Sequence, residues 1–91
     1  MITLKESQEY GLPGWFAMRQ RLRWASTLHR RNVDKLSTHE RKARELGLPF
    51  PHTKTLGHEK EALTRTKEGL DRAERAIKLI QTDQQWSQVE T

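Results

Sequence analysis

The chain has 91 residues, no cysteine, 33% hydrophobic residues and a formal net charge of +5 at pH 7. This length fits one small domain, and the absence of cysteine excludes disulfide and thiolate chemistry. The sequence also contains no apolar run long enough for a signal peptide or a membrane span. We therefore expect a cytoplasmic protein with no membrane association and marginal stability, because a domain of this size gains little net free energy from its own core.

Helix signals begin at the N-terminus. Thr3 and Glu6 have the spacing of a capping box, which predicts a short helix over residues 4–10 that ends at Gly11. Residues 15–36 contain neither Gly nor Pro and are rich in long unbranched side chains. This composition predicts a long second helix.

The segment after residue 36 carries a second set of start and stop signals. Ser37 and Glu40 form another capping box, which can begin a separate short helix over 38–46 or bend the preceding helix. Gly47 occupies the position at which a helix commonly ends in the left-handed conformation, and Pro49 prevents continuation. Residues 47–56, with their Pro, Gly and His, are predicted to form an extended linker.

A heptad-like pattern predicts a long last helix over residues 57–83, followed by a frayed polar tail over 84–91. Gly69, in the middle of this helix, permits either a close helix approach or a local bend. Four acid-to-base pairs at i,i+4 support the helix: Glu61 with Arg65, Glu68 with Arg72, Asp71 with Arg75, and Glu74 with Lys78. Its apolar stripe needs a neighbour, so it forms a helix-packing or dimer seam made of Leu56, Leu63, Leu70, Ile77 and Ile80.

No segment has the alternating pattern of a β-strand. The sequence therefore predicts an all-α fold in a single domain spanning 1–91. We expect a small helical hairpin or three-helix arrangement with two long antiparallel helices, a short connecting helix and a short N-terminal helical turn.

The positive charge is concentrated in one third of the chain. Nine of the 17 basic residues lie between residues 15 and 46, together with only three acids. In projection at 100° per residue, one side of the 15–36 helix is an apolar arc predicted to face the core. Its members are Trp15, Met18, Leu22, Ala25, His29, Val33 and Leu36.

Two basic groups lie outside that arc. Arg19, Arg23 and Arg30 form a row beside it, which we call the arginine row. On the opposite side, Arg21, Arg31 and Lys35 surround a second apolar group of Ala17, Trp24 and Leu28.

Arginine and aromatic side chains together suggest an anionic partner. Arg19, Arg23, Arg30 and Arg31 can bind phosphates bidentately, and an exposed Trp24 could stack on a base. For Trp24 we favour the alternative, that it packs under the short helices, because a core-poor chain needs its large aromatics for packing. Arg41, Lys42 and Arg44 form a secondary basic patch, which we interpret as a solvated charged face.

Signs of catalysis are missing from the sequence. The histidines lack the spacing of a metal site, no glycine-rich loop could cradle a nucleotide, and the carboxylates of the last helix stand beside bases. We expect a protein that is not an enzyme and uses no metal or cofactor.

Three functional hypotheses follow. The leading one is a small helical protein that binds DNA or RNA through phosphate contacts of its Arg-rich helix. The alternative is a non-enzymatic adaptor or inhibitor, of the type that phages and mobile elements encode, which docks its basic aromatic helix on an acidic groove of a partner protein. The third is a homodimeric coiled-coil module. Sequence preference, oligomeric state and the nature of the partner stay open at this point.

Overall fold

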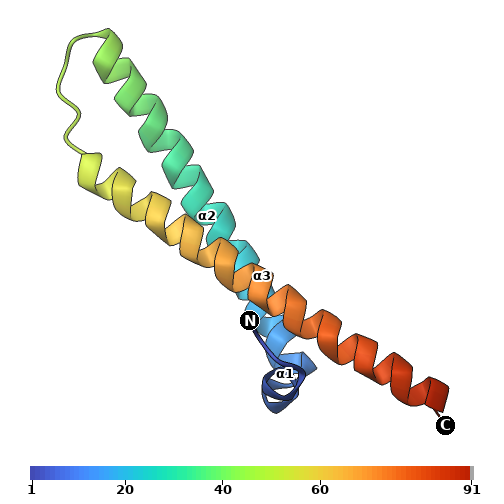
Figure 1. The fold of residues 1–91 in the computed structure, drawn as a ribbon. Helices are drawn as coiled ribbons and strands as arrows, with labels where there is room; N and C mark the ends of the chain where they lie inside the picture. The colour runs from blue at the N-terminus through green and yellow to red at the C-terminus, as the bar shows by residue number, and fades with distance from the viewer. Residues whose placement is uncertain (91) are drawn as a thin grey trace.

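The structure, a computed structural model, describes residues 1–90. Over this range the chain is all-α and consists of α1 (Leu4–Tyr10), α2 (Leu12–Glu45) and α3 (Thr53–Glu90). The two long helices lie side by side as an extended hairpin of 70 × 17 × 16 Å, with α1 crossing near the open end (Figure 1). The predicted all-α hairpin is confirmed.

The first helix has the predicted cap and end. The hydroxyl of Thr3 accepts a hydrogen bond from the Glu6 backbone N–H at 3.2 Å. Gly11, with φ of +82°, ends α1 and is at once the N-cap of α2. The second helix starts at Leu12, three residues before the predicted start, because Pro13 in its first turn has no N–H that the helix would need to bond.

The predicted short helix over 38–46 does not exist as a separate element, because α2 runs without a break to Glu45. Glu40 does not reach back toward Ser37; its carboxylate lies 3.8 Å from Arg44, one turn ahead, in an i,i+4 pair of an uninterrupted helix. The alternative in which this segment continues the preceding helix is therefore the one observed.

The end of α2 is as predicted. Gly47 has φ of +67°, and its N–H donates to the carbonyl of Arg44 at 3.2 Å. The N–H of Leu48 donates to the carbonyl of Ala43 at 2.8 Å, which completes a Schellman motif.

The third helix is longer than predicted at both ends. It begins at Thr53, inside the predicted linker, and remains helical through Glu90, where a frayed tail was expected. Thr91 lies outside the described residues.

The core lies where all three helices meet. Ile2 and Trp15 pack there against Ala73, Ala76, Ile77 and Ile80 of α3. The indole N–H of Trp15 donates to the carbonyl of Ser7 at 2.9 Å, and both residues are buried, so this bond ties α1 to α2. Farther along the hairpin, a Cβ on Gly69 would lie 3.2 Å from a methyl of Leu22, as expected for a close helix approach.

The predicted seam of α3 is used inside the hairpin. Leu56, Ile77 and Ile80 are buried, while Leu63 and Leu70 are half-buried. These side chains therefore serve helix packing, and a dimer through them would require the hairpin to open.

Candidate nucleic-acid interface

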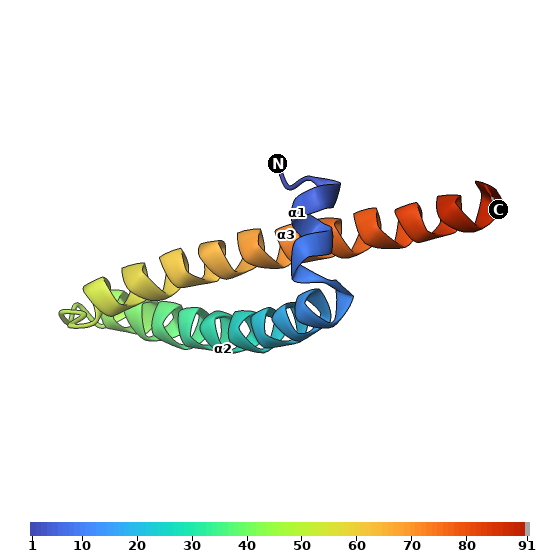
Figure 2. The same ribbon diagram turned by 90° about the horizontal axis from the view of Figure 1, so that it is seen from below.

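The rotational orientation of α2 follows its apolar arc. Trp15 is buried and every other predicted member of the arc, from Met18 to Leu36, is half-buried. The opposite side of α2 therefore faces away from α3. Figure 2 shows α2 and α1 on different sides of α3, so α1 does not cover that outward surface.

Trp24 lies on this outward surface and is 65% exposed, with Leu28 41% exposed one turn later. The prediction that Trp24 packs under short helices was wrong. The helices that were expected to cover Trp24 are not there. Within residues 1–90, α1 packs against the start of α2 and against α3, and no connecting helix folds back over α2.

Because α2 is continuous, Lys42 of the secondary basic patch lies on the same helix as the basic residues around Trp24. At 100° per residue, Lys42 falls on the same side as Trp24 and Lys35. We call this surface the outer face. At a rise of 1.5 Å per residue it extends for about 32 Å along the helix. Its members are Arg21, Trp24, Leu28, Arg31, Lys35 and Lys42, all of them exposed.

The outer face carries four positively charged side chains. Within residues 1–90, none of its four basic side chains forms an ion pair. Of the acids of α2, Glu40 projects to another side of the helix, while Asp34 and Glu45 border the face, three residues after Arg31 and Lys42. Within residues 1–90 the face therefore presents four cations without an ion pair around an exposed indole.

Two of the three side chains in the arginine row make contacts within the protein. The guanidinium of Arg19 lies over the Phe16 ring, 5.1 Å from its centroid, and Arg23 lies 3.6 Å from Glu74 of α3. Arg30 has no ion pair among the described residues. An exposed pair such as that of Arg23 contributes little free energy and can exchange partners.

A hollow of about 540 Å³, lined mainly by basic and hydroxyl-bearing residues, connects the row with the outer face. Arg23, Arg30 and Arg31 line it together with the hydroxyl residues Ser26 and Thr27. Asp34 and Leu70 complete its lining, and the single carboxylate offsets part of the positive potential.

The remaining members of the secondary patch occupy other sides of the same helix. Arg41 projects with the arginine row, and Arg44 pairs with Glu40. Thus Arg41, Lys42 and Arg44 do not form one patch.

His29, the polar member of the apolar arc, has a structural partner. Its Nδ1 lies 2.7 Å from a carboxylate oxygen of Glu59 on α3. The hydrogen bond from His29 lowers the pKa of Glu59; partial burial opposes this shift, and a hydrogen bond from Asn32 adds to it. This contact ties the two long helices together.

Among residues 1–90, the histidines and acids form no group of three or more that could hold a metal ion. In the same range no helix combines the length and the apolar character that crossing a membrane would require.

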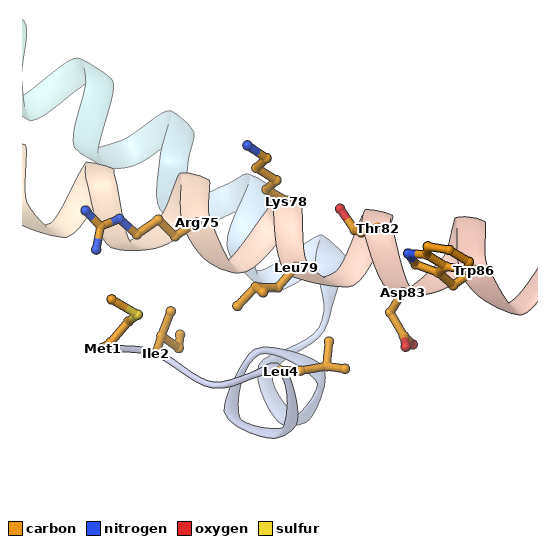
Figure 3. Close-up of a pocket in the computed structure, with 9 residues that line it drawn as sticks. All are labelled: Met1, Ile2, Leu4, Arg75, Lys78, Leu79, Thr82, Asp83 and Trp86. Carbon is orange, nitrogen blue, oxygen red and sulfur yellow. The ribbon is translucent and has the colours of Figure 1, made fainter.

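A second surface was missed at the sequence level. The N-terminal residues Met1, Ile2 and Leu4 run along α3 and enclose, with Leu79 and Trp86, an apolar groove of about 570 Å³ (Figure 3). The signal in the sequence was the spacing of Leu79, Trp86 and Val89, which places these three apolar residues on the side of α3 opposite Ile77 and Ile80. All three are exposed in the structure.

No protein-family model, curated protein or solved structure matches the chain. The function of this protein is therefore inferred from the chemistry of these surfaces.

Proposed function

We propose that this protein binds DNA or RNA through the outer face of α2, chiefly by contacts to phosphate. The observation that carries the proposal is an exposed tryptophan, Trp24, among four basic side chains that form no ion pair within residues 1–90. The expectation that it is a cytoplasmic, non-enzymatic protein belongs to the same proposal.

The chemistry of the outer face suits a polyanion. Arg21 and Arg31 offer planar guanidinium forks that match phosphate oxygens, and Lys35 and Lys42 add point charges along the same line. Neutralising several phosphates releases counterions, which is the main source of affinity in sequence-independent binding. The face needs no recognition of base edges for this.

Trp24 adds a contact that depends on the state of the nucleic acid. In a duplex the bases are stacked on each other, whereas an unpaired base presents its ring to an exposed indole. Stacking of this kind contributes about 1–3 kcal/mol per base. Single strands or flipped-out bases should therefore bind more tightly than a regular duplex.

The arginine row supplies a second line of contact on the neighbouring side of α2. Within residues 1–90 Arg30 forms no ion pair, and Arg31 borders both surfaces through the hollow. A strand following the outer face could place a phosphate in that hollow while Arg23 leaves Glu74.

One observation favours the alternative partner. Trp24 and Leu28 stand one helical turn apart and both are exposed, which gives the basic face an apolar centre of the kind found at protein hot spots. An acidic groove on another protein would satisfy the same chemistry, so a direct binding experiment must separate the two.

The experiment is a salt series with mixed-sequence duplex and single-stranded oligonucleotides. A phosphate-driven binder loses affinity steeply, with a log-log slope of about −0.9 per neutralised phosphate on duplex DNA. Absence of binding at low salt would leave the protein-partner hypothesis.

A matched pair of variants locates the site. Changing the four outer-face bases to alanine removes four charges, as does changing four exposed bases of α3, namely Lys54, Lys60, Arg65 and Lys67. Both variants have the same net charge. Only the first should flatten the salt slope, and an equal effect of the two would mean that bulk charge rather than the outer face drives binding.

A further inference from the structure

The hollow beside the arginine row lies to one side of the outer face. In helical projection its α2 residues centre about 100° around the helix axis from Trp24 and Lys35, and only Arg31 belongs to both surfaces. Leu70 of α3 also lines it, so the hollow lies between the two long helices. A strand that follows the outer face therefore passes beside this hollow and does not run through it.

The lining of the hollow is strongly basic. Three guanidiniums line it, those of Arg23, Arg30 and Arg31. Among residues 1–90 the only carboxylate there is that of Asp34, so the lining has a formal charge of +2. Its volume of about 540 Å³ falls within the range of about 300–1,000 Å³ that is typical of small-molecule sites. The hollow is therefore suited to a small anion with two negative charges.

Hydrogen-bond donors for such an anion are available. Ser26 is half-buried and makes no side-chain hydrogen bond within residues 1–90, so its hydroxyl can donate to a bound oxygen. The Thr27 hydroxyl, by contrast, already donates to the backbone carbonyl of Arg23 at 3.0 Å. Arg30 and Arg31 form no ion pair in the same range, which leaves two guanidinium forks for bidentate contacts.

Arg23, the third guanidinium, is held by a weak contact. One of its terminal nitrogens lies 3.6 Å from a carboxylate oxygen of Glu74, and both side chains are about half exposed. An exposed pair of this kind contributes little free energy, so Arg23 can turn to an anion in the hollow at small cost. Glu74 does not line the hollow and would not face that anion.

We infer that the hollow binds the terminal phosphate of a nucleic-acid strand. This inference rests on the proposed function, because the outer face holds the rest of the strand. A terminal phosphate is a monoester with a charge of about −1.5 to −2 at pH 7. It matches the charge of the lining better than an internal phosphate, which carries one negative charge.

The position of the hollow favours a strand end for a second reason. An internal phosphate could enter the hollow only if the strand on both sides of it left the outer face. A terminal phosphate continues into the chain on one side only. The strand then turns aside once, near Arg31, and its other nucleotides stay beside the cations and the indole of the outer face.

The test compares three versions of one short single strand, made both as DNA and as RNA: with a 5′-phosphate, with a 3′-phosphate and with neither. Both ends carry the same monoester, so the version that gains affinity identifies the direction of the strand along α2. We expect at least one phosphorylated version to bind about tenfold more tightly than the strand without a terminal phosphate. We call this ratio the terminal-phosphate gain.

The outcomes separate this inference from the proposed function. Equal affinity of all three versions overturns the inference and leaves the proposed function intact. Absence of binding by all three contradicts the proposed function, and the inference falls with it.

A matched pair of arginine variants distinguishes the hollow from bulk charge. Arg30→Ala and Arg21→Ala each remove one exposed guanidinium of α2 that forms no ion pair within residues 1–90, but only Arg30 lines the hollow. Arg30→Ala should lower the terminal-phosphate gain from about tenfold to about twofold or less. Arg21→Ala should leave the gain unchanged even if it weakens binding of every strand. An equal effect of the two variants on the gain overturns the inference.

The carboxylate of the hollow provides a test in the opposite direction. Asp34→Asn removes the negative charge that a phosphate there would face, so the terminal-phosphate gain should rise by about two- to fivefold. Glu45→Gln removes the same charge at an exposed position of α2 outside the hollow and should not change the gain. Circular dichroism checks that each variant is helical. If the gain ignores Asp34→Asn, or responds equally to Glu45→Gln, the terminal phosphate binds elsewhere and the inference fails.

Discussion

Nδ1 of His29 lies 2.7 Å from a carboxylate oxygen of Glu59, and this contact joins α2 to α3 in the half of the hairpin that holds few buried residues. The core is gathered near α1, whereas between His29 and the linker the helices meet mainly through half-buried side chains. The His29–Glu59 contact therefore contributes a larger share of the free energy that holds α2 against α3 there than it would in the core next to Trp15.

The lowered pKa of Glu59 gives this contact a pH dependence. Because the ionised carboxylate is favoured in the folded state, the stabilisation is present above the ordinary pKa of 4.5 and is lost as the pH falls through the lower folded value. Glu59→Gln should therefore reduce the free energy of unfolding at neutral pH by about 1 kcal/mol, with the difference vanishing in acid. Urea unfolding followed by circular dichroism at several pH values measures this. A difference that persists unchanged in acid would contradict it.

The Gly69 contact predicts an asymmetry between two glycines of α3. Alanine is favoured over glycine in a helix by up to about 1 kcal/mol, so Gly57→Ala, with open space around its Cβ, should stabilise the protein. At Gly69 the new Cβ would lie 3.2 Å from Leu22, which must shift, so Gly69→Ala should stabilise less or destabilise. Thermal unfolding of the two variants compares them directly. Equal gains would show that the helices do not approach closely at Gly69.

Trp15→Phe tests the junction between α1 and α2. The substitution removes the bond to the Ser7 carbonyl and leaves unfilled volume in the core, so we expect a loss of about 1–3 kcal/mol of unfolding free energy. Trp24→Phe, at an exposed position, should change stability by less than about 0.5 kcal/mol. Denaturant titrations of both proteins separate the two roles, and a similar cost at both positions would refute the burial pattern.

Trp24→Ala tests base stacking apart from phosphate binding. Loss of about 1–3 kcal/mol of stacking should weaken binding to a short single strand by roughly 5–150-fold, while the salt slope on duplex DNA stays the same. Trp86→Ala is the control, because Trp86 is 62% exposed on α3 and lies off the outer face. The strand should be too short for two copies. Equal affinities of the original protein and Trp24→Ala would remove stacking from the proposal.

Elements whose signals act within one or two turns were predictable. The Thr3 cap and the Gly47 helix end depend on hydrogen bonds to residues at most five positions away, and the arc from Trp15 to Leu36 depends only on helical periodicity. For the same reason the pairs Glu61–Arg65 and Asp71–Arg75 formed as expected.

Features that depend on neighbours from elsewhere in the chain were not predictable. Arg72 pairs with Glu6 of α1, and Glu74 with Arg23 of α2, in place of their expected partners four residues away. Two similar ion pairs compete with little difference in free energy, so the choice follows from which side chains the packed helices bring close.

Local sequence signals were enough to predict that the chain is helical, that helices end at Gly11 and Gly47, and that the positive charge is concentrated between residues 15 and 46. The exposure of Trp24, the presence of Lys42 on the same face and the groove beside Leu79 became apparent only from the packed helices. Helix formation and capping depend on neighbouring residues, whereas the exposure of a side chain depends on how all the helices pack. Here α1 packs mainly against α3, and the outer face of α2 is therefore uncovered.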